Sequence, residues 1–94
     1  MILQHGTIHT MAGETIEQGY IVIQNGVIEQ VGTGDLLHVE DEDIIDLKGA
    51  HVYPGFIDAH THFDLHVAGT VTADDFVTGT KAALRGGTTT IIDF

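Results

Sequence analysis

The chain contains no cysteine and only three lysine or arginine residues among its 94 positions. Without cysteine, disulfide bonds and thiolate-bound metals are excluded. Cysteine usage therefore gives no indication of the cellular compartment. The few basic residues face 14 carboxylates, which gives a net charge of −11. That balance argues against binding to nucleic acid phosphates and disfavours anionic membrane surfaces.

Long apolar runs are also missing. No stretch approaches the roughly 20 residues that a membrane-spanning helix needs, and the first residues lack the basic start and apolar core of a signal peptide. We therefore expect a cytoplasmic protein. Hydrophobic residues make up 43% of the chain and charged residues 18%, a composition typical of a globular chain with a small core.

Residues 1–53 are dominated by short β-rich runs, which predicts the N-terminal strands of a small β-sandwich, connected as a meander. The clearest signal is Asn25-Gly26, which lies between two β-rich runs and predicts a hairpin. His5-Gly6 is interpreted as a tight turn, and the acidic run Glu40–Asp43 as a solvated loop. The expected strands are 1–4, 7–10, 20–24, 27–31, 44–47 and 50–53.

The pattern changes after Pro54-Gly55, and residues 54–94 predict a β-α-β unit. We expect a strand at 56–63, a helix at 73–85 with Thr72 as its N-cap, and a strand at 88–94. Such a unit implies two parallel strands with a right-handed crossover, and therefore an α/β class with a β-rich N-terminal part. Because a two-stranded parallel sheet leaves both edges open, the chain is interpreted as a fragment.

The metal-binding signal is the sequence Asp58-Ala59-His60-Thr61-His62. Side chains alternate across a strand, so His60, His62 and Asp58 are expected on one face. Two imidazoles at this spacing can bind one divalent ion of the zinc type, and Asp58 is a candidate for orienting a ligand from behind. An H-x-H pair is a weak signal by itself, but this one ends a strand that opens a βα unit, where active sites of parallel barrels lie.

The run Pro54–His62 resembles the first barrel strand of the amidohydrolase superfamily. The segments after it, Gly69–Phe76 and Gly86–Phe94, resemble the dihydropyrimidinase and D-hydantoinase branch. The resemblance implies the first β-α-β of a TIM-like (β/α)8 barrel after a small β-sandwich, and a homo-oligomer. It further implies a binuclear metal centre, usually zinc, with His60 and His62 on the more buried metal.

The activity that the resemblance implies is ring opening of a dihydropyrimidine or hydantoin to an N-carbamoyl amino acid, by a metal-bridging hydroxide. The family's bridging lysine, two further histidines and proton-handling aspartate are expected from later strands, so the catalytic residues are not assigned. Lys48, in a predicted turn, and Lys81, on the predicted helix, do not fit the bridging role. The isolated 94 residues are expected to be inactive and to bind metal weakly.

Several other residues remain open. Asp64 either shapes the loop over the site or caps a turn, Asp93 is expected to support the site from behind, and His66 is interpreted as an exposed loop residue. The dispersed histidines, at 5, 9, 38 and 51, are interpreted as turn and strand-surface residues. The alternative functions are a dihydroorotase or allantoinase-like hydrolase, and a non-catalytic fragment or assembly module.

Overall fold

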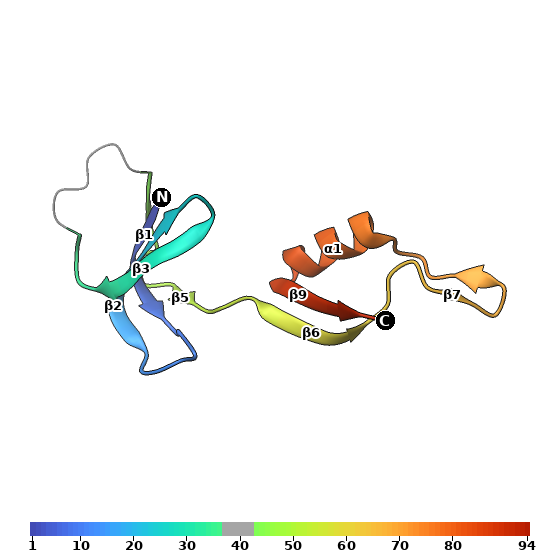
Figure 1. The fold of residues 1–94 in the computed structure, drawn as a ribbon. Helices are drawn as coiled ribbons and strands as arrows, with labels where there is room; N and C mark the ends of the chain where they lie inside the picture. Colours follow the sequence, from blue (N-terminus) through green and yellow to red (C-terminus); the bar gives the residue numbers. More distant parts are fainter. Residues whose placement is uncertain (37–42) are drawn as a thin grey trace. The chain divides into compact units, whose positions relative to one another are not determined.

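The fold was analysed in a computed structural model, which describes residues 1–36 and 43–94 (Figure 1). The chain divides into two compact units, Met1–Pro54 (unit 1) and Gly55–Phe94 (unit 2). His38 and most of the acidic run 40–43 lie outside the described residues, so the interpretation of that run as a solvated loop stays a prediction.

Unit 1 is built around one five-stranded sheet. The strands of this sheet are β1 (Ile2–Ile8), β2 (Ile16–Gln24), β3 (Val27–Thr33), β4 (Ile44–Asp46) and β5 (His51–Val52). They lie in the order β3-β2-β1-β4, with β5 also paired to β1. β1 pairs antiparallel with β2 and parallel with both β4 and β5.

The hairpin predicted from Asn25-Gly26 is confirmed. These two residues connect β2 to β3 and have φ angles of 51° and 75°, the left-handed region that a two-residue hairpin turn requires. Asparagine and glycine enter that region at the lowest cost, which is why this pair could be read from the sequence.

Two sequence interpretations for unit 1 are wrong. His5-Gly6 is not a turn: β1 runs straight through it, and the register against β2 shifts there instead. His5 takes a φ of 60°, so the left-handed residue produces a bulge within the strand rather than a reversal. The strands also do not form a meander. In a meander each strand pairs with the next one in sequence, whereas β4 and β5 both pair with β1, and in parallel.

The buried core of unit 1 lies where β1 and β2 pair. Ile2, Ile8, Tyr20 and Ile21 are buried, with between 2% and 8% of their surface exposed. Glycine at position 32 leaves room for the Tyr20 ring, since a Cβ there would lie 2.5 Å from the phenolic oxygen. The sheet is therefore held by a few large side chains on two strands, and a second, facing sheet of a sandwich stays a prediction.

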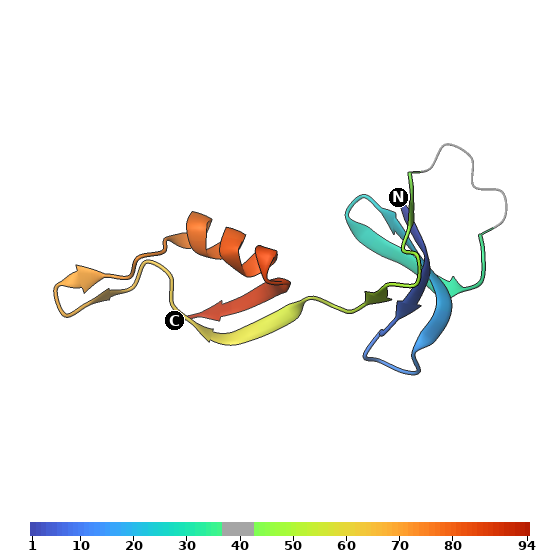
Figure 2. The ribbon, with the colours of Figure 1, turned by 180° about the vertical axis from the view of Figure 1, so that it is seen from behind.

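Unit 2 contains the predicted β-α-β arrangement. β6 (Phe56–Thr61) and β9 (Thr88–Asp93) pair in parallel, and α1 (Phe76–Arg85) connects them. Figures 1 and 2 show α1 lying over one face of this pair, and α1 packs against β9. Among the described residues the parallel sheet has these two strands only, so closure into a barrel stays a prediction.

The helix begins three residues later than predicted, and Thr72 is not its N-cap. The Thr72 hydroxyl accepts a hydrogen bond from the Leu65 amide at 3.0 Å, so it serves the preceding loop. Asp75 caps the helix instead, in a capping box with Thr78. The two candidates lie three residues apart, and the Thr72 hydroxyl is already bonded to the Leu65 amide.

A short hairpin between β6 and α1 was not predicted. β7 (His66–Val67) and β8 (Thr70–Val71) pair antiparallel across Ala68-Gly69. Ala68 has a φ of 50° and Gly69 a φ of 77°. Alanine is an unusual residue for this turn position, so the sequence carried only half of the hairpin signal.

Within the described residues, no helix is long and apolar enough to cross a membrane.

Candidate metal centre

The two histidines of the H-x-H sequence lie side by side at the carboxyl end of β6. His60 is inside the strand and His62 follows its last residue, Thr61. Their ring centroids are 5.1 Å apart, with the rings nearly perpendicular. Both side chains are exposed. This part of unit 2 therefore presents two imidazoles close together and open to solvent.

Simple strand alternation does not fully account for that arrangement. The predicted strand ran to Phe63, whereas β6 ends at Thr61, two residues earlier. The register of β6 against β9 also shifts between Asp58 and Thr61. Asp58 pairs with Ile91 and Thr61 pairs with Asp93, so β6 advances by three residues where β9 advances by two. The rings meet, but the backbone that carries them is irregular rather than a regular strand.

An aromatic ring that the sequence interpretation missed lies beside both histidines. The ring centroid of Phe94 is 4.6 Å from that of His60 and 5.2 Å from that of His62. The Phe94 carbonyl oxygen also contacts Nδ1 of His62. The parallel pairing could have revealed it, because Thr61 lies opposite Asp93 and the residues that follow them emerge at the same edge.

Two candidate supporting carboxylates contact the backbone of this segment. Asp58 Oδ1 accepts a hydrogen bond from the His60 amide at 3.0 Å, and Asp93 Oδ1 accepts one from the Phe63 amide at 2.9 Å. One carboxylate comes from β6 and the other from β9. Together they hold the two ends of the segment that carries both imidazoles.

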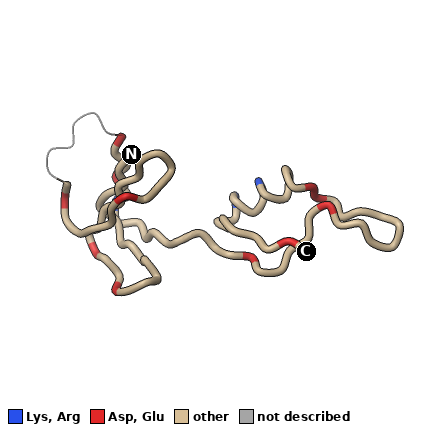
Figure 3. Tube along the Cα trace, viewed as in Figure 1, with Lys and Arg blue, Asp and Glu red and all other residues tan. Residues whose placement is uncertain are grey.

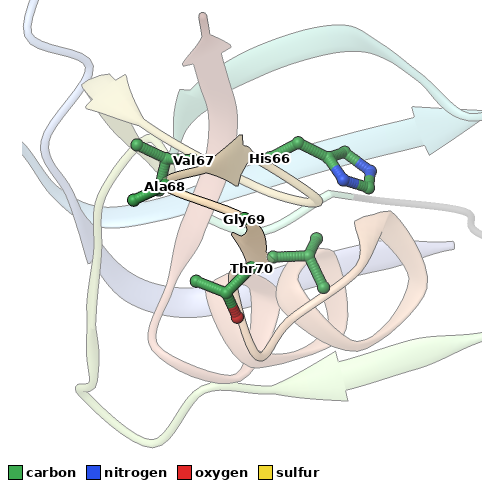
Figure 4. Close-up of a pocket in the computed structure, with 6 residues that line it drawn as sticks. His66, Val67, Ala68, Gly69 and Thr70 are labelled. Atoms are coloured by element: carbon green, nitrogen blue, oxygen red, sulfur yellow. The ribbon is translucent and has the colours of Figure 1, made fainter.

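Asp64 and His66 have more local surroundings. Asp64 has a φ of 50°, and its amide donates to the carbonyl of Asp74 at 2.9 Å, which closes the loop before α1. His66 is exposed in β7, in a strand rather than in the loop that was predicted. The open hollow in Figure 4 is lined by the six consecutive residues 66–71, all from this hairpin. The histidine pair is not among them.

The chemistry of the pair fits a divalent metal, as far as two ligands can. Imidazole nitrogen is a good ligand for zinc and its neighbours. When Nδ1 of His62 donates to the Phe94 carbonyl, Nε2 carries the lone pair that a metal needs. Within residues 1–36 and 43–94, however, no group of three or more histidine and carboxylate side chains could bind a metal together.

The lysines lie as the sequence predicted. Lys48 is in the turn after β4, where its amide donates to Asp46 Oδ1 at 2.9 Å, and Lys81 is on α1.

Figure 3 shows that the acidic residues are spread along both units.

One histidine of unit 1, His9, contacts two residues that are far from it in the sequence, His51 and Tyr53. His9 Nε2 lies 2.8 Å from His51 Nδ1, and the His9 ring stacks on Tyr53 with centroids 4.2 Å apart. The parallel pairing of β1 with β5 brings them together, since Thr7 lies opposite His51. His9 and His51 are 42 residues apart in the chain, and the sequence pattern alone could not have paired the segments that carry them.

Comparison with known proteins shows which family this chain resembles. Residues 51–94 match the model of the Amidohydrolase family. The chain is 46% identical over 93 residues to the D-hydantoinase of Geobacillus stearothermophilus. The matched region covers 99% of this chain and 19% of that protein.

Solved structures give the same result. A D-hydantoinase from Bacillus sp. AR9 matches with a TM-score of 0.86 at 44% identity, over 99% of this chain and 19% of that chain. The dihydropyrimidinase from Brevibacillus agri NCHU1002 matches with a TM-score of 0.86 at 42% identity, with the same coverage. The chain spans about a fifth of the length of these relatives. These findings confirm the resemblance of the chain to the amidohydrolase family and, within it, to the D-hydantoinase and dihydropyrimidinase branch.

Proposed function

We propose that the complete protein that carries this chain is a metal-dependent cyclic amidohydrolase, which opens a hydantoin or dihydropyrimidine ring to an N-carbamoyl amino acid. The observation that supports it most is the meeting of the His60 and His62 rings at the carboxyl end of β6. That end of a parallel strand is where barrel enzymes bind substrate. The 46% identity to a D-hydantoinase supports the choice of substrate class.

In this proposal His60 and His62 bind a divalent metal, zinc in a binuclear centre. When bound by these residues, zinc would lower the pKa of water toward neutrality and would polarise the carbonyl of a cyclic amide. The residues of this chain bind and orient: the two imidazoles provide nitrogen ligands, and Phe94 packs against both rings and limits the positions they take. The remaining ligands and the proton-handling group come from outside these 94 residues.

The same proposal assigns units 1 and 2 their places in the whole protein. Unit 1 contributes strands to a small β-sandwich, and unit 2 is the first β-α-β of a (β/α)8 barrel. The complete protein is a cytoplasmic homo-oligomer. The isolated 94 residues have no activity, because two histidines fall short of the three protein ligands that catalytic zinc sites typically have.

Ring opening by the complete protein tests the proposal. Hydantoin and dihydrouracil are supplied separately, with dihydroorotate and allantoin as the substrates of the alternative hydrolases. We expect turnover of the first pair and a loss of kcat/KM of about hundredfold or more in His60→Ala and His62→Ala, since even partners behind the ligands are typically worth 10–100-fold. His66→Gln, an exposed exchange in the β7–β8 hairpin, serves as the control.

Two results would contradict the proposal. Turnover of dihydroorotate or allantoin in place of the first pair would assign the protein to the other substrate class. Zinc-dependent turnover by the 94-residue chain alone, abolished in His60→Ala, would show that the chain is a sufficient catalyst.

A further inference from the structure

Two carboxylates hold the segment from His60 to Phe63 through its main chain. The contact of Asp58 with the His60 amide spans two residues, the pattern by which an aspartate side chain takes over the role of a backbone acceptor. The contact of Asp93 with the Phe63 amide crosses from β9 to the chain just after β6. Both acceptors are the Oδ1 atom of an aspartate, at 3.0 and 2.9 Å.

The backbone of this segment departs from the regular ladder, which explains why it uses side-chain acceptors. The register between β6 and β9 shifts between Asp58 and Thr61, and Phe63 lies beyond the last residue of β6. A backbone amide outside a regular ladder takes a partner from a side chain or from water. The carboxylates provide that partner at each end of the irregular stretch.

We propose that Asp58 and Asp93 are positioning residues, which set the imidazoles of His60 and His62 by accepting from main-chain amides and not by charge on the rings. The usual arrangement behind a metal-bound histidine is a carboxylate that accepts from the ring nitrogen itself. Here the ring nitrogen Nδ1 of His62 contacts the Phe94 carbonyl, and each carboxylate reaches a backbone amide. The functional role of this positioning rests on the proposed metal site. The backbone contacts themselves need no metal.

The two mechanisms differ in what they require of residues 58 and 93. A main-chain acceptor needs an oxygen at Oδ1 and no negative charge, so asparagine replaces aspartate and alanine does not. A carboxylate that acts by charge on the imidazoles loses its effect with asparagine and alanine alike. The comparison of Asp→Asn with Asp→Ala therefore separates them.

The first experiment measures amide hydrogen exchange by NMR in the 94-residue chain without metal. We expect Asp93→Ala to raise the exchange rate of the Phe63 amide by about threefold to tenfold, the value of one ordinary hydrogen bond. Asp58→Ala does the same at the His60 amide, and the two asparagine variants stay near the wild-type rates. Asp74→Ala is the control, because its described contact in this loop is made by its backbone carbonyl.

The second experiment measures zinc affinity and kcat/KM in the complete protein. Asn variants are expected to keep both near wild type, and Ala variants to lose affinity by about tenfold to hundredfold. Equal loss in Asn and Ala variants, or no change in exchange in any variant, overturns the inference. If an Ala variant fails to fold, the Asn variant decides: retained protection supports the inference and lost protection refutes it.

Failure of the inference and failure of the proposed function remain distinguishable. The exchange experiment contains no metal and no substrate, so its outcome stands whatever reaction the complete protein catalyses. Conversely, absence of ring opening with normal protection at Phe63 would reject the enzyme proposal and leave the backbone contacts intact.

Discussion

The imidazole Nδ1 of His5 lies 3.1 Å from Oδ1 of Asp46, across the parallel pair β1 and β4. On the other side of the ring, Nε2 lies 2.9 Å from Oδ1 of Asp35. The hydrogen bond to Asp46, and then the one to Asp35, raise the pKa of His5 above its usual 6.5. The Lys48 amide and His5 in turn lower the pKa of Asp46.

These contacts predict a pH dependence of the stability of unit 1. Because the folded pKa of His5 is raised, its stabilisation is fully present below the unfolded pKa of 6.5 and is lost as the pH rises through the folded value. We expect the urea midpoint of unit 1 to fall slightly as the pH increases above 6.5, and to be flat there in His5→Gln. Tyrosine fluorescence measures unit 1, since both tyrosines, Tyr20 and Tyr53, belong to it and the chain has no tryptophan.

The control for this prediction is His66→Gln, which removes a histidine from unit 2 and leaves the contacts of His5 in place. It should keep the wild-type slope. A wild-type slope that persists in His5→Gln would show that another group is responsible.

The helix cap gives a second prediction. Asp75 Oδ1 accepts from the Thr78 amide at 2.8 Å, and the Thr78 hydroxyl accepts from the Asp75 amide at 3.2 Å. We expect Asp75→Ala to lower the helical melting midpoint of unit 2 by on the order of 5 °C, while Asp75→Asn, which keeps the acceptor, loses much less. Circular dichroism at 222 nm follows α1, the one helix among the described residues.

Charge at Asp75 adds a pH signature. The Thr78 amide and hydroxyl lower the pKa of this carboxyl below its usual 3.8. A lowered pKa means that the stabilisation is present above the unfolded value and is lost as the pH falls through the folded one. Helicity of the wild type should therefore decrease in strongly acidic solution more steeply than that of Asp75→Asn. Equal slopes in both proteins would contradict the role of the ionised cap.

The sequence predicted those parts of the fold that depend on local chemistry. Asn25-Gly26 specified its hairpin because both residues favour positive φ, and the alternation of β-rich and helical patterns specified the parallel pair in unit 2. The H-x-H pair was likewise identified directly from the sequence, by its two histidines and their spacing. Part of what the sequence did not predict depends on contacts that a local pattern does not contain: the parallel return of β5 to β1, and the hydrogen bond from the Leu65 amide to Thr72, seven residues further along the chain.

The candidate site shows the same division. His60 and His62 were identified by type and spacing, whereas Phe94 joins them only through the register of β6 with β9. The idea that Asp58 and Asp93 lie behind the pair could be formed from strand periodicity. That they bond to amides and not to rings depends on the register shift, which a pattern of residues does not contain.

A third prediction concerns Gly79, the buried residue of α1. In a helix interior, alanine is normally preferred over glycine by about 1 kcal/mol. Here a Cβ at position 79 would lie 2.5 Å from Cδ1 of Phe63 and closer still to Cε1, so Gly79→Ala should destabilise unit 2. In a Phe63→Ala background the same change should instead stabilise it by about 1 kcal/mol. Thermal unfolding at 222 nm of the four proteins measures the change of sign, and an unchanged sign would show that the ring moves aside freely.

The last prediction uses the turn between β7 and β8. Ala68 carries a φ of 50°, which costs an alanine roughly 1–2 kcal/mol relative to its preferred conformations. Asparagine tolerates this region, and Ala68→Asn would reproduce the Asn-Gly pair that connects β2 and β3. We therefore expect Ala68→Asn to slow amide exchange at Val67 and Thr70, the pair that flanks the turn, with Ala68→Val, whose branched side chain is disfavoured at positive φ, changing it in the opposite direction. NMR exchange rates at these amides, with Ile91 in β9 as an internal reference, measure the effect. Faster exchange in Ala68→Asn would mean that the strain at Ala68 does not limit the hairpin.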